Sequence, residues 1–252
     1  MHPLRTIRKK QRDRMYELPG FRLIDLLNPY YIDRKTIYDF VQRSGGRYHG
    51  GDILDFGCGS RPYEKLFTCK TYTGCDIYVS GHPNDDKKAD VYYDGHTLPF
   101  EAEHFDFILS TQVLEHVEDF EEIFGELVRV LKKNGILILT VPFCFEEHEK
   151  PYDFRRFTGF GIKKILEENG IEVLELEKST NYKTAVMYMQ CMYRDNQYRK
   201  KHTLYRFIAR YVSCVVNNLK FILWESKRKS HQKEDDDMGI NFFIIGKKRG
   251  SS

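Results

Sequence analysis

The stretch Ile53-Leu54-Asp55-Phe56-Gly57-Cys58-Gly59-Ser60-Arg61-Pro62 predicts the fold of this chain. An apolar run leads into an aspartate and two glycines, which indicates a buried strand whose carboxyl end opens into a tight loop. Gly57 and Gly59 have no Cβ, so the backbone can turn sharply there and a ligand can approach it closely. Pro62 suits the first turn of a helix, so we expect a helix to begin near it. In open α/β sheets, the crevice at the carboxyl ends of the strands binds ligands.

A second acid follows at the end of the next predicted strand. Residues 72–77 read YTGCDI, and Asp76 lies 17 residues after Gly59. An acid at about this spacing accepts hydrogen bonds from a ribose diol in nucleotide-binding sheets. The third glycine of the dinucleotide fingerprint G-x-G-x-x-G is absent, because Pro62 stands in its place. The pattern therefore disfavours a nicotinamide dehydrogenase and favours another nucleotide-like ligand.

Five motifs in order give the chain a family resemblance. They are DFGCG at 55–59, Asp76, Asp94 ahead of LPF, FDFILS at 105–110 and LEHV at 114–117. In this set the chain resembles the class I methyltransferases that use S-adenosyl-L-methionine (SAM), with a type 11-like methyltransferase domain. The resemblance covers residues 50–180 and returns near the C-terminus. It implies that Asp76 binds the ribose and Asp94 the adenine of SAM. The other expected cofactor-binding residues are Asp55, Gly57, Cys58, Gly59, Ile77, Gly95 and Thr111.

The resemblance also implies the architecture. We expect a Rossmann-like α/β fold, an open sheet of about seven mostly parallel strands with helices on both faces and an antiparallel last strand. The apolar run 135–142 is typical of a strand buried on both faces, and Asn134-Gly135 is predicted to stop the helix before it. Thr158 is a predicted cap for a helix that ends at Asn169-Gly170.

Three segments are expected along the chain. Residues 1–49 form a basic N-terminal helical arm and cover, residues 50–180 with 239–249 form the SAM-binding core, and residues 181–238 form a basic helical insertion before the final strand. The insertion carries an apolar stripe at helical spacing. Its members are Leu204, Phe207, Ile208, Tyr211, Val212, Val215, Leu219, Ile222 and Leu223. We expect the stripe to pack on the chain's own core or on a homodimer partner, with peripheral membrane contact through 204–224 as the alternative.

Composition and charge bound the function classes. The 252 residues are 41% hydrophobic and 31% charged, and six scattered cysteines form no C-x-x-C pair. No stretch approaches the 18 apolar residues of a spanning helix, and the N-terminus lacks the apolar run of a signal peptide. These features predict a cytoplasmic protein with reduced thiols, with the inner face of the membrane as a second location.

The net charge of +3 hides a division. Residues 1–49 carry +6, 50–182 carry −12, 183–233 carry +10 and 234–252 carry −1. The basic segments either neutralise the acidic core by packing on it or offer a basic surface to an anionic partner. The sequence leaves both readings open.

The candidate catalytic stretch follows the apolar run 135–142. Residues 148–158 read HEKPYDFRRFT, and the pattern H-E-x-P-x-D-x-x-R-x-T resembles a bacterial subset linked to surface-glycan or secondary methylation. His148 is the predicted general base and Asp153 the residue that orients it, because imidazole titrates near neutral pH. The alternative is a salt-bridged loop that only closes the pocket, and for Arg155 and Arg156 a structural role is favoured.

Gln112, Glu115 and His116 raise the question of a metal. Some quinone-biosynthesis methyltransferases carry E-x-x-E-H at the corresponding place and bind a divalent cation. Here Gln112 replaces the first acid, which removes a charged oxygen ligand suited to Mg²⁺ or Ca²⁺. No metal is therefore expected.

These observations predict a SAM-dependent methyltransferase that O-methylates a hydroxyl of a saccharide or another polar small molecule. No N-P-P-Y motif follows residues 105–110, so nucleobase amines are disfavoured and nucleic acid is not an expected partner. The alternatives are a nucleic-acid methyltransferase, which the basic segments would suit, and a non-catalytic SAM-binding or scaffold protein.

Overall fold

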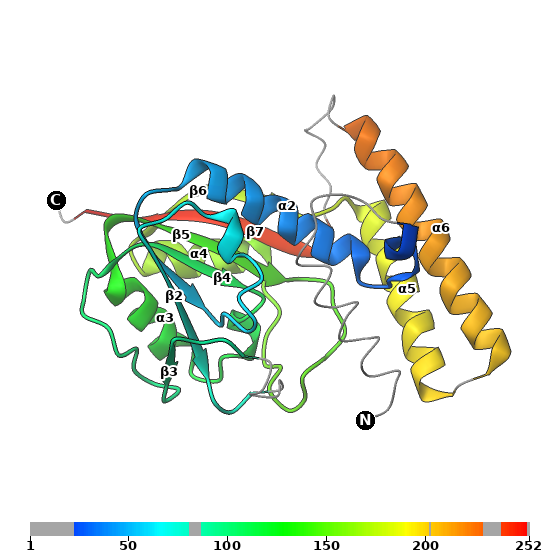
Figure 1. Ribbon diagram of the computed structural model, residues 1–252, viewed down its shortest axis with the longest axis horizontal. Coiled ribbons are helices and arrows are strands. Elements are labelled where there is room, and N and C mark those ends of the chain that lie inside the picture. Colours follow the sequence, from blue (N-terminus) through cyan, green and yellow to red (C-terminus); the bar gives the residue numbers. More distant parts are fainter. Residues whose placement is uncertain (1–22, 81–86, 202, 229–237, 251–252) are drawn as a thin grey trace. The chain divides into compact units, whose positions relative to one another are not determined.

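The computed structural model describes residues 23–80, 87–201, 203–228 and 238–250 (Figure 1). Residues 1–22 of the expected N-terminal arm and residues 229–237 of the expected insertion lie outside the described residues. None of the helices in the described ranges is both long and apolar enough to span a bilayer. All six cysteines are free thiols.

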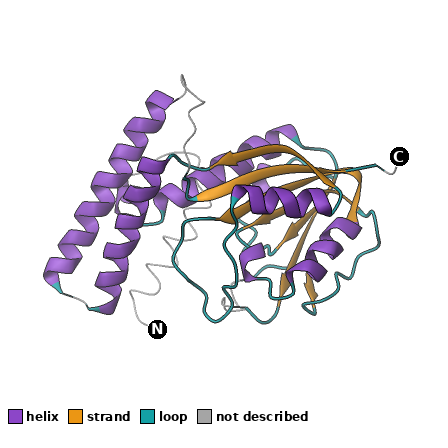
Figure 2. Cartoon of the chain, turned by 180° about the vertical axis from the view of Figure 1, so that it is seen from behind, coloured by secondary structure: helices purple, strands orange, loops and turns teal. Residues whose placement is uncertain are grey.

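The described chain contains a seven-stranded sheet. Its strands lie in the order β3-β2-β1-β4-β5-β7-β6. The bounds are β1 Asp52–Phe56, β2 Thr71–Ile77, β3 Val91–Tyr93, β4 Phe105–Thr111, β5 Leu131–Pro142, β6 Ile171–Lys178 and β7 Asn241–Lys248. β3, β2, β1, β4 and β5 pair in parallel, whereas β5, β7 and β6 are antiparallel neighbours. Helices pack around the sheet (Figure 2), which confirms the predicted Rossmann-like architecture.

Helical periodicity gives the helices that cover the sheet. α3 (Phe120–Val130) buries Phe120, Ile123, Phe124, Leu127 and Val130, which recur at three- and four-residue steps. α4 (Gly159–Glu168) begins as predicted, because Thr158 Oγ1 accepts the Gly161 N–H at 3.1 Å. It ends at Asn169-Gly170, where Gly170 takes the left-handed conformation at φ +75°. α2 (Tyr31–Arg47) lies within the expected N-terminal helical segment, residues 1–49.

Two local predictions are wrong. The helix expected at Pro62 is only a short 3₁₀ turn, η2 (Glu64–Leu66), so the glycine loop leads into irregular chain. Asn134-Gly135 does not stop α3, which ends at Val130, and β5 begins at Leu131. Asn134 takes φ +63° beside a register irregularity between β4 and β5, so these residues form a kink within the strand.

The described chain divides into two compact units. One contains the described residues up to Thr36, then Cys144–Glu146 and Lys178–Asn241; the other contains Ile37–Phe143, Glu147–Glu177 and the residues from Phe242 on. The second unit holds the sheet and the large apolar core of β1, β4, β5 and α3. The first unit holds the helical hairpin α5 (Tyr182–Lys200) and α6 (Leu204–Arg228), together with the 3₁₀ turn η1 (Leu23–Leu27).

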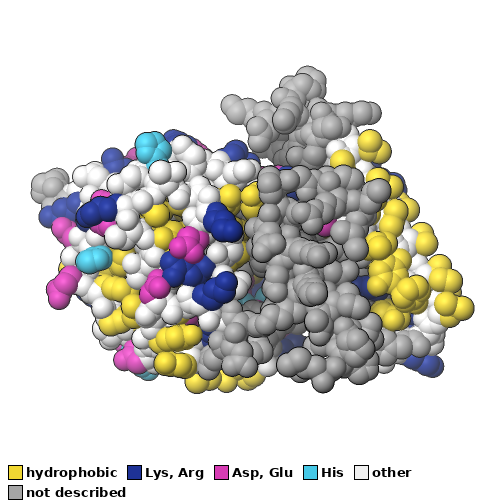
Figure 3. All heavy atoms as spheres, viewed as in Figure 1, with side chains coloured by type: hydrophobic (Ala, Val, Ile, Leu, Met, Phe, Trp, Pro, Cys, Tyr) yellow, Lys and Arg dark blue, Asp and Glu magenta, His cyan; other side chains and the backbone are white. Residues whose placement is uncertain are grey.

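α6 faces the opposite way from the sequence-based expectation. Its predicted apolar stripe stays largely in solvent, since Leu204, Ile208, Val212 and Leu223 are each more than half exposed. Figure 3 shows hydrophobic side chains gathered along this helix. The buried face instead carries Cys214, Asn217, Asn218 and Phe221. The reason is that polar side chains satisfy the inner backbone: Asn217 Nδ2 donates to the Met187 carbonyl at 2.8 Å, and Asn218 Nδ2 donates to carbonyls of residues 25, 26 and 28. The expectation that the stripe packs on the chain's own core is therefore wrong.

Candidate functional site

The predicted cofactor residues gather at one edge of the sheet. Asp55 lies near the end of β1, Asp76 and Ile77 end β2, Asp94 and Gly95 follow β3, and Thr111 ends β4. These four strands are neighbours in the sheet and run in parallel. Their carboxyl ends therefore meet at the edge where open α/β sheets bind ligands.

The glycine loop after β1 has the backbone that the sequence predicts. Gly57 takes φ +72°, and a Cβ built on it would lie 2.3 Å from Val113 Cγ2. Gly59 takes φ +49°, but a Cβ there would meet no described atom within 4 Å. The N–H groups of Gly57 and Cys58 donate to the Cys75 carbonyl at 2.8 and 3.2 Å, which ties the loop to β2. Gly57 is thus required by packing, whereas Gly59 borders open space.

Asp76 lies beside this loop and is held in place by backbone donors. Its Oδ2 accepts the Gly59 N–H at 2.9 Å, and its Oδ1 accepts the Ile77 N–H at 2.7 Å. Lys87 Nζ lies 3.2 Å from Oδ1 and also donates to the Ile77 carbonyl. Sequence reasoning missed Lys87, because nothing in its position along the chain points to the sheet edge.

Asp94 is an exposed acceptor at the end of β3. Its Oδ1 accepts the N–H groups of His96 and Thr97, both at 2.8 Å. These two bonds lower the pKa of Asp94, so the carboxylate is charged near neutral pH. The neighbouring Gly95 takes φ +100°. An ionised carboxylate on this turn fits the amino group of an adenine.

Asp55 differs from the other acids because it is buried. Only 2% of its surface is exposed, and its Oδ2 accepts the Tyr72 hydroxyl at 2.8 Å. Burial raises the pKa of Asp55 to about 7. The Asp55 carboxyl group therefore lies in the interior beneath the glycine loop, which also contains the buried Cys58.

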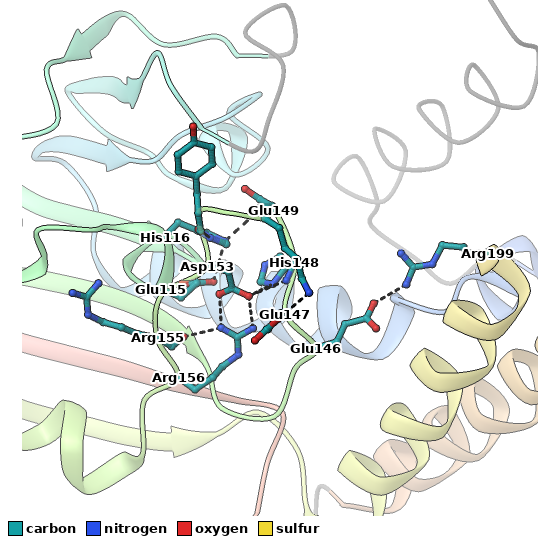
Figure 4. Close-up of polar contacts among 12 residues, drawn as sticks. Glu115, His116, Glu146, Glu147, His148, Glu149, Asp153, Arg155, Arg156 and Arg199 are labelled. Carbon is teal, nitrogen blue, oxygen red and sulfur yellow. Dashed lines mark hydrogen bonds and ion pairs between the residues drawn. The ribbon is translucent and has the colours of Figure 1, made fainter.

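The loop after β5 holds the predicted catalytic pair (Figure 4). His148 Nδ1 lies 3.2 Å from Asp153 Oδ2, which also accepts the His148 backbone N–H at 2.8 Å. Arg156 donates to both oxygens of Asp153, at 2.5 and 2.7 Å. Burial raises the pKa of Asp153, but the Arg156 and His148 hydrogen bonds and the Arg156 charge outweigh it and set the pKa at about 2. The structure thus brings His148 and Asp153 together, with the aspartate ionised.

The two arginines of this loop have structural contacts. Arg155 donates to the Val117 and Glu118 carbonyls, and its guanidinium lies over the Phe120 ring. Arg156 is paired with Asp153. The Arg155 contacts fix the loop to the residues after β4, and the Arg156 contact holds the loop together internally.

Glu115 and His116, which the sequence raised as possible metal ligands, lie side by side after β4, with Glu115 buried and His116 partly buried. Glu115 is fully buried, and neither oxygen of its carboxyl group has a hydrogen-bond partner among the described residues. Burial raises the pKa of Glu115 to about 8 and lowers that of His116. Gln112 is turned away to β5, since its Nε2 donates to Thr140 Oγ1 at 3.0 Å. Only a histidine beside a glutamate was visible in the sequence, and burial of the carboxyl group was not.

Comparisons with known proteins match part of this chain to methyltransferases. Residues 54–139 match the family model described as a methyltransferase domain. Sterol 24-C-methyltransferase erg6 of Schizosaccharomyces pombe is 28% identical over 102 residues, which cover 34% of this chain and 26% of that protein. A ubiquinone biosynthesis O-methyltransferase of Actinobacillus pleuropneumoniae is 25% identical over 136 residues, 48% of this chain and 56% of that one. The chain therefore matches only part of the length of these relatives.

Solved structures share the fold at low identity. The [4+2]-cyclase SpnF superposes with a TM-score of 0.54 at 17% identity, over 86% of this chain and 82% of that one. An S-adenosylmethionine-dependent methyltransferase from Mesorhizobium loti gives 0.51 at 12% identity, over 86% and 100%.

Fold and site together define the class I SAM-dependent methyltransferases. Residues 54–139 match the methyltransferase domain of that class, whose cofactor is SAM. The residues present fit this cofactor, since Asp76 and Asp94 offer carboxylate acceptors at adjacent strand ends and Gly59 leaves its side open.

Proposed function

We propose that this chain transfers the methyl group of SAM to a hydroxyl of a saccharide or another polar small molecule, with His148 as the general base. The observation that carries the proposal is the chain of contacts from Arg156 through Asp153 to His148. An ionised Asp153 can accept a hydrogen bond from the Nδ1–H of His148. That places the proton on Nδ1 and leaves Nε2 with a lone pair, which is the tautomer of a general base.

SAM supplies the methyl group when bound. The chain's own part is to hold the acceptor hydroxyl in line and to take its proton at His148. Positioning accounts for most of the rate of such a displacement, and a general base adds about 10²–10⁴-fold. Asp153 orients the imidazole and stabilises it once it is charged.

Cofactor binding is tested by calorimetric titration with S-adenosylhomocysteine, set beside NAD. We expect S-adenosylhomocysteine to bind and NAD not to. Asp76→Ala should weaken binding by about 1.5–3 kcal/mol, because a hydrogen bond to a charged acceptor is lost. Unchanged affinity in Asp76→Ala would contradict the placement of the ribose.

Methyl transfer is tested with methyl-labelled SAM and a panel of acceptors: monosaccharides, a catechol and a sterol. We expect label on oxygen, and turnover in His148→Ala lower by about 10²–10⁴-fold with cofactor affinity unchanged. Label on carbon or nitrogen would overturn the reaction class, and near-normal turnover of His148→Ala would overturn the base.

Two other functions are outcomes of the same tests. SpnF shares the fold, yet its name describes a cyclase, so the fold is compatible with other chemistry. Cofactor binding without transfer to any acceptor would favour a scaffold. Affinity for DNA or RNA that falls steeply with salt would favour a nucleic-acid methyltransferase.

We also infer that the exposed face of α6 lies on an anionic membrane surface, which would put the protein at the inner face of the cytoplasmic membrane. This face exposes Leu204, Ile208, Val212, Val216, Leu219 and Leu223. Residues 183–233 carry +10, so two copies repel each other here while anionic lipid attracts them. Flotation with phosphatidylglycerol vesicles at low salt, lost in Val212→Glu, supports this contact. A homodimer in solution without flotation overturns it.

A further inference from the structure

A cluster of possible metal ligands lies where β4 and β5 end. Glu115, His116 and His148 each offer one ligand atom, and these atoms all lie within 4.8 Å of one another (Figure 4). Glu115 and His116 follow β4, and His148 follows β5, which is the neighbouring strand. The sheet topology therefore brings together side chains that are more than 30 residues apart in the sequence.

Glu115 is a buried acceptor with nothing to accept. No part of its side chain is exposed, and both carboxyl oxygens are without hydrogen-bond partners among the described residues. The Glu115 backbone carbonyl accepts the Phe154 N–H at 2.9 Å, whereas the carboxyl group has no such partner among the described residues. Buried polar groups are almost always hydrogen-bonded, and a buried carboxylate without a partner is costly.

His116 presents a lone pair to this carboxyl group. Its Nδ1 lies 2.5 Å from the Tyr152 carbonyl oxygen, which can only accept, so Nδ1 carries the proton. Nε2 is then an acceptor, and it is buried without a hydrogen bond, 3.8 Å from Glu115 Oε1 and 3.9 Å from Glu149 Oε1. Nε2 thus lies close to two carboxyl groups, and a cation bound there would displace the Glu115 proton and take the lone pairs of both residues as ligands.

Both imidazoles have the outer contacts of ligating histidines. Metal-binding histidines commonly donate their second ring N–H to a backbone carbonyl or a carboxylate, which fixes the tautomer. The Tyr152 carbonyl has this role for His116, and the Asp153 carboxylate has it for His148.

We propose that Glu115, His116 and His148 bind a divalent transition-metal ion such as Zn²⁺ or Co²⁺. Two imidazoles and one carboxylate suit these ions, whereas Mg²⁺ and Ca²⁺ require a shell of oxygens. This site departs from the expectation of no metal, which weighed Gln112, Glu115 and His116. Gln112 is hydrogen-bonded to Thr140 and is not a ligand in this site. The third ligand, His148, comes from a loop distant in the sequence.

The site has a consequence that rests on the proposed function. A lone pair of His148 that is donated to a metal cannot take a proton from an acceptor. Metal loading is therefore expected to stop the general-base step, and a chelator to restore it. Metal binding itself does not depend on the identity of the acceptor or on SAM.

The test begins with chelator-treated full chain titrated with Co²⁺, whose visible absorption reports imidazole and carboxylate ligands. We expect one Co²⁺ per chain, an affinity at least about tenfold weaker in Glu115→Gln and in His116→Ala, and no change in His96→Ala. His96 is the matched control, because it belongs to an exposed cluster with Asp119 and Glu122. No visible band, or a band lost in His96→Ala and kept in Glu115→Gln, would overturn the site.

Glu115→Gln also separates a metal ligand from a structural residue. The amide has the same shape, is neutral, and has an N–H to donate toward His116. We expect the metal-free variant to melt no lower than the parent chain while its Co²⁺ affinity falls. Lower melting temperature with unchanged Co²⁺ affinity would overturn the proposal. Co²⁺ bound with turnover unchanged would uphold the site and overturn His148 as the base.

Discussion

Lys87 Nζ lies 3.2 Å from Asp76 Oδ1, and only 3% of the Lys87 side chain is exposed. With the Ile77 N–H on the same oxygen and the Gly59 N–H on Oδ2, the Asp76 carboxylate has three donors already. Each carboxylate oxygen accepts about two hydrogen bonds. One acceptor position is therefore left for the two hydroxyls of a ribose, and Lys87 competes for the other.

Lys87→Met should raise the affinity for S-adenosylhomocysteine by roughly 2- to 10-fold, the value of one net hydrogen bond. Without the lysine, Asp76 Oδ1 can accept a hydrogen bond from the ribose diol. The uncompensated carboxylate then also gains more free energy from the hydroxyl donors of the ligand. Calorimetry measures the change, with the exposed neighbour Lys88→Met as control. Weaker binding in Lys87→Met would show instead that the lysine contacts the cofactor.

Gly57→Ala and Gly59→Ala should separate packing from ligand contact. Both residues have positive φ, which costs a non-glycine residue about 1–2 kcal/mol. Gly57→Ala adds a clash with Val113, so its unfolding free energy should fall by more than that. Gly59→Ala should lose only the φ cost in stability, yet bind S-adenosylhomocysteine at least about tenfold more weakly. Urea denaturation and calorimetry give the two quantities, and equal stabilities would contradict the packing role of Gly57.

Asp55 should make stability fall with pH across a defined window. Its pKa rises from about 3.9 in the unfolded chain to about 7 in the fold. Between these values the folded state binds more protons, so the free energy of unfolding decreases as pH rises from about 4 to about 7, by up to about 4 kcal/mol.

In Asp55→Asn this contribution is absent. The difference in unfolding free energy, variant minus parent, should therefore rise from pH 4 to 7 and then level off. Denaturation at each pH measures it, with the exposed Asp119→Asn as control. A flat difference would place the Asp55 carboxyl group in contact with water.

Asn218 should be a stability residue of the helical unit. Its buried Nδ2 lies 3.3, 3.0 and 2.9 Å from the carbonyl oxygens of Asp25, Leu26 and Asn28. Asn218→Ala should lower the free energy of unfolding by about 1–3 kcal/mol, and Asn218→Asp by more, because a carboxylate cannot donate. The exposed Lys220→Ala should leave it within about 0.5 kcal/mol. Equal changes in the free energy of unfolding in these three variants would contradict a stabilising role for the Asn218 hydrogen bonds.

The sheet and its binding edge were predictable because they follow from local patterns. The run 53–56 and the acids after successive strands fix which ends meet, since parallel strands share one carboxyl edge. The orientation of α6 was not predictable, because Asn217 and Asn218 bury polar atoms against carbonyls that only the tertiary fold supplies. The same holds for Glu115, whose burial depends on Phe154 folding back from 39 residues away. The prediction of a helix at Pro62 was wrong because proline is only compatible with the first position of a helix. It does not make the following residues helical.

The Ser179 N–H donates to the Asn241 carbonyl at 2.9 Å, and the Ile240 N–H donates to Thr180 Oγ1 at 3.1 Å. The segment that contains α5 and α6 thus begins after β6 and ends before β7, and hydrogen bonds join its two ends. With respect to the sheet, this segment is a loop whose ends are held together. Doubling the length of such a loop costs only about 0.6 kcal/mol in loop-closure free energy. The helical hairpin can therefore change in length or sequence during evolution while the bonds at its two ends keep β6 and β7 in register.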